Sequence, residues 1–168
     1  MKFLLAGLIV LGTAAAALAD IQVRFNESAP KDSFVVRNAG DCTLSDLSIT
    51  IDLATSQAGL IFDVTGSGAG VEVFQPLEWV SGGDALRSVP EEVKDGDTQL
   101  TLDVRALGAG DEIAFTIDVD DTIGQREITV SDAEIEGARV TASKDGKRRD
   151  AHFDRSALAV VALTGCRL

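Results

Sequence analysis

The sequence predicts a single all-β domain, an antiparallel β-sandwich of the immunoglobulin-like or fibronectin-like type with about ten short strands. Apolar and polar residues alternate in many short segments, as in strands with one face on a core. Turn-forming residues separate these segments. Beyond the apolar N-terminus, no segment combines a helical stripe with helix caps. A β-barrel or a jelly roll is the alternative architecture.

The first half of the chain contains five predicted strand segments, at 21–25, 33–37, 47–53, 59–64 and 71–80. The last of these contains Pro76, which has no N–H group to donate to a β-ladder. We therefore predict an edge strand there, or a strand interrupted by a bulge. The glycine-rich stretch 66–70 lacks the Lys-Ser/Thr ending of a phosphate-binding loop, and no amphipathic helix follows it. It is predicted to be a flexible turn.

The clearest alternation occurs in segments 100–104 and 113–119, which a short glycine-containing loop joins. A β-hairpin that places Val104 opposite Ile113 would bring the apolar residues of both segments onto one face. We therefore predict that these two segments are paired.

The C-terminal part is predicted to form strands at 128–130, 135–142, 147–153 and 158–163. Asp145 and Gly146 separate the second of these strands from the third. This dipeptide suits a two-residue type I′ turn, so a β-hairpin is predicted around it.

Residues 1–19 are typical of a secretory signal peptide. Lys2 precedes an apolar run, and the small residues Ala17 and Ala19 fit cleavage before Asp20. The alternative is an N-terminal membrane anchor, but the run is short for a span and is interrupted by glycines.

The mature chain, residues 20–168, is predicted to be one acidic domain in the periplasm or outside the cell. The full chain has a net charge of −12, and removal of Lys2 makes it more acidic. An acidic surface argues against nucleic acids and anionic membranes as partners. The longest apolar run of the mature chain, 157–163, has the length of a strand, so no membrane span is predicted after signal-peptide removal.

The two cysteines, Cys42 and Cys166, suggest one disulfide, because an even pair in an exported chain is commonly oxidised. The alternatives are two free thiols or a metal pair. A Cys/His zinc site is improbable with a single histidine in the chain.

The densest acidic cluster consists of Asp118, Asp120 and Asp121. These residues could supply oxygen ligands to Ca²⁺, with a further carboxylate from Asp95 or Asp97. The pattern is not an EF-hand, because the start and the distant glutamate of that motif are absent. The alternative is a solvated acidic strand end that discourages edge-to-edge aggregation.

The basic residues Lys147, Arg148 and Arg149 follow Lys144 at the predicted hairpin. They could dock an acidic partner or the acidic face of a second copy. The alternative is an exposed hairpin tip with charged flanks.

No catalytic residue is predicted. His152, the single histidine, is expected to be exposed, and Ser67 does not lie in a Gly-x-Ser-x-Gly motif between a strand and a helix. The chain has one Trp and no Tyr, a thin supply of the aromatic platforms usual in sugar-processing sites.

Three stretches carry a family resemblance: ALADIQVRFNESAPKDSFVVRNAGDCTLSDLSITIDL, AGLIFDVTGSGAGVEVFQPLEWV and LGAGDEIAFTIDVDDT. Together they cover most of the mature chain and resemble the aggregation factor core proteins, which are small exported bacterial proteins. The resemblance implies cell-surface adhesion or aggregation.

Two β-sandwich families are more distantly similar. FVVRNAGDCTLSDLSITIDL is similar to the start of a CARDB-type adhesion module, and LGAGDEIAFTIDVDDTIG to the second half of a Calx-beta domain. The second similarity implies that Asp118, Asp120 and Asp121 help to bind Ca²⁺. The tail continues with Thr122 and Ile123 and lacks the further acidic residues of that family.

The predicted function is therefore that of an exported, non-catalytic β-sandwich with a binding, adhesion or aggregation role at the cell envelope. The expected partner is a protein or a cell surface, and Ca²⁺ is the candidate cofactor. The alternatives are a secreted hydrolase on a β scaffold and an envelope assembly subunit that docks by the edge strand near Pro76.

Overall fold

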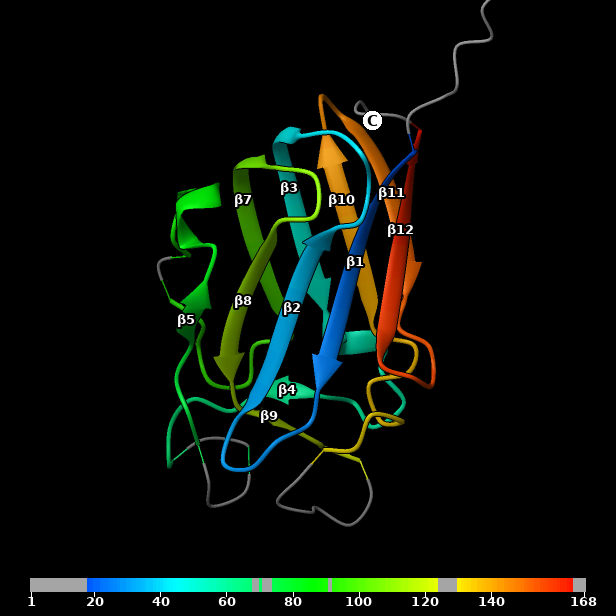
Figure 1. Ribbon diagram of the computed structural model, residues 1–168. Helices are drawn as coiled ribbons and strands as arrows, with labels where there is room; N and C mark the ends of the chain where they lie inside the picture. The colour runs from blue at the N-terminus through cyan, green and yellow to red at the C-terminus, as the bar shows by residue number, and fades with distance from the viewer. Residues whose placement is uncertain (1–17, 68–69, 71–73, 91, 124–129, 165–168) are drawn as a thin grey trace, which may run out of the picture.

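The computed structural model describes residues 18–67, 70, 74–90, 92–123 and 130–164, in which two five-stranded antiparallel sheets form a β-sandwich (Figure 1). The first sheet contains, in spatial order, β12 (Leu158–Thr164), β1 (Leu18–Asn26), β2 (Asp32–Asn38), β8 (Glu112–Ile117) and β5 (Glu78–Ser81). The second contains β11 (Lys147–His152), β10 (Arg139–Lys144), β3 (Leu44–Asp52), β7 (Gln99–Leu107) and β6 (Leu86–Ser88).

A third, two-stranded sheet pairs β4 (Ile61–Phe62) with β9 (Val119–Asp120) at one end of the sandwich. The helical content consists of two short 3₁₀ turns, η1 (Leu53–Thr55) and η2 (Gly83–Ala85). The predicted all-β sandwich is confirmed. The described residues form twelve strands rather than about ten.

Alternating side chains from both large sheets meet in one core between them. In β2 and β8 the buried and less buried positions alternate along the strand. Aromatic rings pack across this layer: Phe34 stacks on Phe115 with 5.3 Å between ring centroids and lies 5.1 Å from Phe25. The period of two in the sequence thus reports which residues face the core.

The predicted hairpin between segments 100–104 and 113–119 is wrong. β7 belongs to the second sheet, where it pairs with β3 and β6, whereas β8 pairs with β2 and β5 in the first. The loop between them therefore crosses from one sheet to the other. Strands that face each other across a core show the same inward alternation as strands paired side by side, so the pattern could not distinguish the two arrangements.

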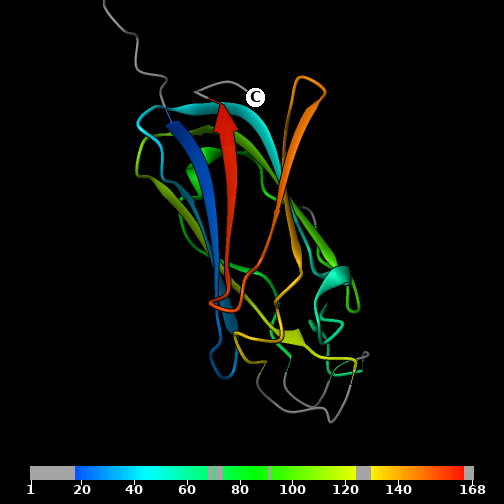
Figure 2. The same ribbon diagram turned by 90° about the vertical axis from the view of Figure 1, so that its right-hand side faces the viewer.

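The predicted C-terminal hairpin is confirmed. β10 and β11 pair through Lys144 opposite Lys147, and the two residues between them, Asp145 and Gly146, have φ values of 50° and 75°. Two consecutive positive φ angles are the geometry of a type I′ turn. Figure 2 shows the sandwich from the side, with this hairpin and β12 diverging at the top.

The predicted strand at 71–80 is shorter in the structure. β5 begins only at Glu78, after Pro76, and forms the edge of its sheet with a register shift beyond Trp79. The edge position is confirmed, and Pro76 lies before the strand, where its missing N–H costs no hydrogen bond of the β-ladder.

Several predictions concern residues outside the described ranges. These are most of the signal peptide, the strand at 128–130 except Val130, and Cys166. The disulfide therefore stays a prediction; Cys42 lies after β2, at the end of the sandwich where β12 ends (Figure 1). Among the described residues, no helix is long and apolar enough to cross a bilayer.

Candidate cation site

Three segments of the chain bring aspartates to the end of the sandwich where β2 begins. Asp32 is the first residue of β2 and is paired with Ile117, the last residue of β8. The chain then continues through Asp118 into β9, which pairs with β4 and so lies beside Asp63. The main-chain N–H of Asp63 donates to the carbonyl of Asp118 over 3.0 Å.

The predicted residues Asp118, Asp120 and Asp121 are all buried, with exposed fractions of 7%, 5% and 3%. The interpretation of a solvated acidic strand end is therefore wrong. The alternation breaks after Ile117, because the chain leaves β2 and forms the separate β4–β9 pair. The N–H of Val119 is then captured by Asp32 Oδ2 at 3.1 Å.

Two aspartates that the sequence did not single out, Asp32 and Asp63, belong to the same group. Their exposed fractions are 3% and 2%. The five residues Asp32, Asp63, Asp118, Asp120 and Asp121 are called the aspartate cluster below. Asp63 could not be recognised from the sequence. It follows the apolar Phe62 in an alternating segment, and the neighbour of a buried residue in such a segment is expected to face solvent.

Gly70 shows how closely two of these carboxylates approach each other. A Cβ atom on Gly70 would lie 1.9 Å from Asp63 Oδ2 and 2.7 Å from Asp120 Oδ2. Both oxygens therefore lie within 2.7 Å of one point, and only glycine can pass over them. Within the predicted turn 66–70, position 70 therefore requires a residue without a side chain.

Hydrogen bonding leaves the cluster incompletely satisfied. Asp32 accepts main-chain N–H groups on both oxygens, from Ser28 at 3.0 Å and from Val119 at 3.1 Å. Asp63 Oδ1, in contrast, is buried and has no hydrogen-bond partner. A buried polar atom of this kind is uncommon and calls for a bound group or a proton.

Of the two additional aspartates considered from the sequence, Asp95 has a side chain that acts on the cluster. Its Oδ1 accepts the N–H groups of Val64 and Thr65, each at 3.1 Å, and its charge acts on Asp63. Asp97 instead accepts the N–H of Lys94 at 2.8 Å, three residues earlier, within its own turn.

The described basic side chains leave three members of the cluster without an ion pair. Among the described residues, no Lys or Arg forms an ion pair with Asp32, Asp63 or Asp118. Elsewhere, the buried Asp52 is paired with Arg139 at 2.8 Å. Carboxylates taken out of water without such a partner are costly to ionise.

The cost of ionising these carboxylates appears as raised pKa values. Burial, followed by the negative charges of Asp32, Asp63 and Asp120, raises the pKa of Asp118 to about 8. Burial likewise raises the pKa of Asp32 to about 7. Burial, followed by the neighbouring Asp95, raises the pKa of Asp63 to about 6. Near neutral pH the cluster therefore holds protons unless a cation replaces them.

The donor set consists of carboxylate oxygens, which suit a hard cation such as Ca²⁺. In the described part of the chain, no group of three or more His, Cys, Asp or Glu side chains has the arrangement that holds a metal ion. A cation would therefore rely on fewer carboxylates, such as the Asp63–Asp120 pair beneath Gly70, and would complete its shell with carbonyl oxygens and water.

The remaining predicted site residues lie elsewhere. Lys147, Arg148 and Arg149 are exposed at the start of β11, as the hairpin prediction implied. His152 is exposed, as predicted, and its Nδ1 lies 2.9 Å from the carbonyl oxygen of Gly137. Ser67 lies in an exposed turn.

The comparisons with known proteins identify no relative: no family model, no curated protein and no solved structure matches this chain.

Proposed function

We propose that the mature chain is an exported, non-catalytic binding module of the cell envelope, with a role in adhesion or aggregation, and that Ca²⁺ stabilises the end of the sandwich formed by the aspartate cluster. The observation that carries the calcium part is the burial of Asp32, Asp63 and Asp118 together, without a described basic partner.

The cation has a clear structural effect under this proposal. Asp32 belongs to the first sheet, whereas Asp120 belongs to β9 of the small β4–β9 sheet and Asp63 follows β4. An ion bound by Asp63 and Asp120 would attract the nearby Asp32 carboxylate, join the two parts and relieve the repulsion between these charges. The end loops of a sandwich are common binding surfaces, so an ordered end would support recognition of a protein or a cell surface.

Export and the adhesive role are supported by the N-terminal sequence, the acidic composition and the resemblance described above. Cleavage after Ala19 would remove Leu18 and Ala19 from β1 and leave that strand starting at Asp20. A Cys42–Cys166 disulfide would then tie the C-terminus to the opposite end of the sandwich from the aspartate cluster.

Thermal unfolding of the mature protein tests the calcium proposal. Metal-depleted protein at pH 7.5 should gain roughly 5–10 °C in melting temperature at a Ca²⁺ concentration about 100-fold above Kd, because a ligand specific for the native state stabilises it. Mg²⁺, which requires a smaller and more regular octahedral site, should have a weaker effect.

The matched control is Asp41→Asn, which removes an exposed carboxylate after β2, far from the cluster. It should keep the full response to Ca²⁺. An unchanged melting temperature of the wild-type protein in Ca²⁺ would remove the cation from the proposal.

A further inference from the structure

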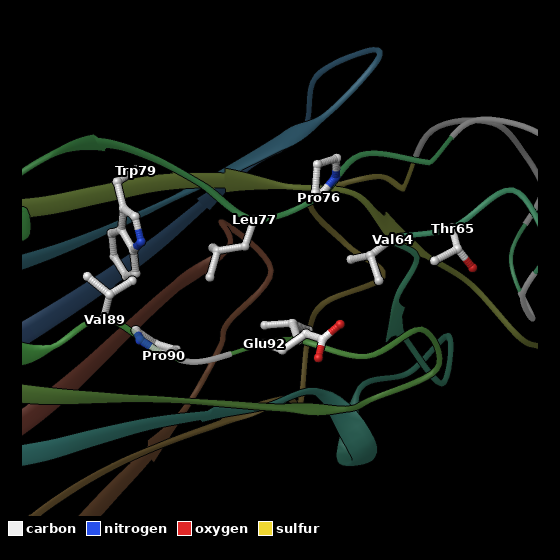
Figure 3. Close-up of a pocket in the computed structure, with 9 residues that line it drawn as sticks. Val64, Thr65, Pro76, Leu77, Trp79, Val89, Pro90 and Glu92 are labelled. Atoms are coloured by element: carbon white, nitrogen blue, oxygen red, sulfur yellow. The ribbon is translucent and has the colours of Figure 1, made fainter.

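A pocket separate from the aspartate cluster opens at the free edge of the sandwich (Figure 3). Its volume is about 440 Å³, within the range of ligand pockets. Two stretches of chain form its walls, with side chains that Figure 3 shows facing one another: Pro76, Leu77 and Trp79 on one side, and Val89, Pro90 and Glu92 on the other.

The Trp79 ring gives this pocket a fixed aromatic wall. Trp79 is paired with Phe115 of β8, and the two rings pack with 5.5 Å between centroids at an angle of 60°. The core thus holds the indole in place while it also lines the pocket. An aromatic surface that is already ordered binds a partner with little further loss of side-chain entropy.

The opposite wall combines exposed apolar surface with one negative charge. Val89 is 54% exposed although it faces Trp79 and Leu77 across the pocket. Glu92 is exposed beside it and forms no ion pair with any described Lys or Arg. An apolar pocket with one unpaired carboxylate is complementary to a ligand with an apolar body and an adjacent cationic group.

The position of the pocket favours a polypeptide as that ligand. β5 is the last strand of its sheet, so the edge of β5 away from β8 has no strand partner among the described residues. An extended segment laid along this edge can form main-chain hydrogen bonds and insert alternate side chains into the pocket. Because β5 is short and has a register shift, it discourages unspecific strand pairing, and specificity would come from the pocket.

We infer that the pocket between Trp79 and Val89 binds an extended segment of a partner protein that presents a bulky apolar side chain next to a Lys or Arg, whose charge pairs with Glu92. The inference goes beyond the proposed function, because no member of the aspartate cluster lines the pocket.

Selection of peptides tests this inference. A phage-displayed library of random dodecapeptides is selected on immobilised mature protein in metal-free buffer, with removal of phage that bind the Val89→Asp variant. The expected consensus contains a bulky apolar residue within two positions of Lys or Arg. An acidic consensus, or no enrichment over Val89→Asp, would overturn the inference.

The consensus peptide is then titrated against the protein, with the emission of Trp79, the single tryptophan, as the readout. Saturable changes are expected for the wild type. Glu92→Gln should weaken binding roughly tenfold through loss of a charge-assisted contact. Val89→Asp should abolish it.

The matched control is Val160→Asp, which changes a valine that is 41% exposed on β12, at the opposite edge of the same sheet, and that does not line the pocket. It should bind like the wild type. Equal loss in both valine variants would contradict a specific pocket. A Trp79 signal that depends on protein concentration alone and disappears in Val89→Asp would assign the pocket to self-association and overturn the proposed partner. The titration is repeated in buffer that contains Ca²⁺, so that its outcome can be separated from the outcome of the calcium proposal.

Discussion

At each end of β2 a polar residue is buried beneath connecting loops, but the surroundings of this residue differ between the two ends. At one end the side chain of Asn38 is fully buried and satisfied. Its Nδ2 donates to the carbonyls of Cys42, Leu107 and Gly108 at 2.7, 2.9 and 3.0 Å, and its Oδ1 accepts the N–H of Gly40 at 3.0 Å. A neutral amide with this many partners closes its end of the sandwich without help from solvent.

At the other end β2 begins with Asp32, and the buried groups around it are carboxylates rather than amides. Asp63 and Asp118 lie nearby without a described basic partner, and Asp63 Oδ1 accepts no hydrogen bond. Because no described Lys or Arg pairs with Asp32, Asp63 or Asp118, these carboxylates respond to protons and to cations. The comparison suggests that the Asn38 end is purely structural, whereas the Asp32 end responds to its surroundings.

The largest expected effect is at the self-contained end. Asn38→Ala leaves one buried and two partly buried carbonyls without their donor, and we expect the free energy of unfolding to fall by about 3 kcal/mol. Chemical denaturation measures this loss, which should be the same with Ca²⁺ and in metal-free buffer. A loss that Ca²⁺ reverses would show that the two ends are coupled and that the comparison is mistaken.

A smaller effect on the free energy of unfolding is expected at the Asp32 end, and its sign should depend on Ca²⁺. Asp118→Asn removes one charge from the cluster and keeps the shape of the side chain. In metal-free buffer at pH 8.5, the variant should be more stable than the wild type by about 1–2 kcal/mol, because a buried carboxylate is costly without a partner. In saturating Ca²⁺ the order should reverse, since the variant has lost a negative charge that attracts the cation.

Denaturation of both proteins in the two buffers measures this reversal, with Asp41→Asn as the exposed control. A variant that is destabilised equally in both buffers would indicate that Asp118 has a packing role only. Stabilisation in both buffers would indicate that the cluster is neutralised by protons and not by Ca²⁺.

The sequence predicted the two layers and the C-terminal hairpin because these depend on local signals. Alternation reports the buried face, and Asp145 with Gly146 selects a type I′ turn. It failed for β7 and β8, because inward alternation is the same whether two strands pair or face each other. That distinction depends on contacts between residues that are distant in the sequence.

The aspartate cluster was predicted in part for the same reason. Asp118, Asp120 and Asp121 are adjacent in the sequence, so their density was visible. Asp32 and Asp63 reach them only through the pairing of β2 with β8 and of β4 with β9. The requirement for glycine at position 70 also arises from this assembly, because the atoms that exclude a Cβ belong to Asp63 and Asp120.

The smallest expected effect is on the pH dependence of the free energy of unfolding. It distinguishes the two ends of β2, because the carboxylates at the Asp32 end bind protons whereas Asn38 does not titrate. Because burial raises the pKa of Asp118 to about 8 and that of Asp32 to about 7, the folded protein holds protons that the unfolded chain, with carboxyl pKa values near 4, has released. Where the folded state binds more protons, the free energy of unfolding falls as the pH rises. Metal-free protein should therefore lose stability from about pH 5 to pH 8.5.

Asp118→Asn should make this decline shallower by roughly 1 kcal/mol per pH unit or less between pH 7 and 8.5, since one titrating group is removed. Asn38→Ala, which changes no titrating group, should lower the whole profile and leave its slope unchanged. Melting temperatures and denaturation midpoints across this range test both expectations. A profile with the same slope in Asp118→Asn as in the wild type would mean that the Asp118 carboxyl is ionised throughout, and the contrast between the two ends of β2 would then rest on hydrogen bonding alone.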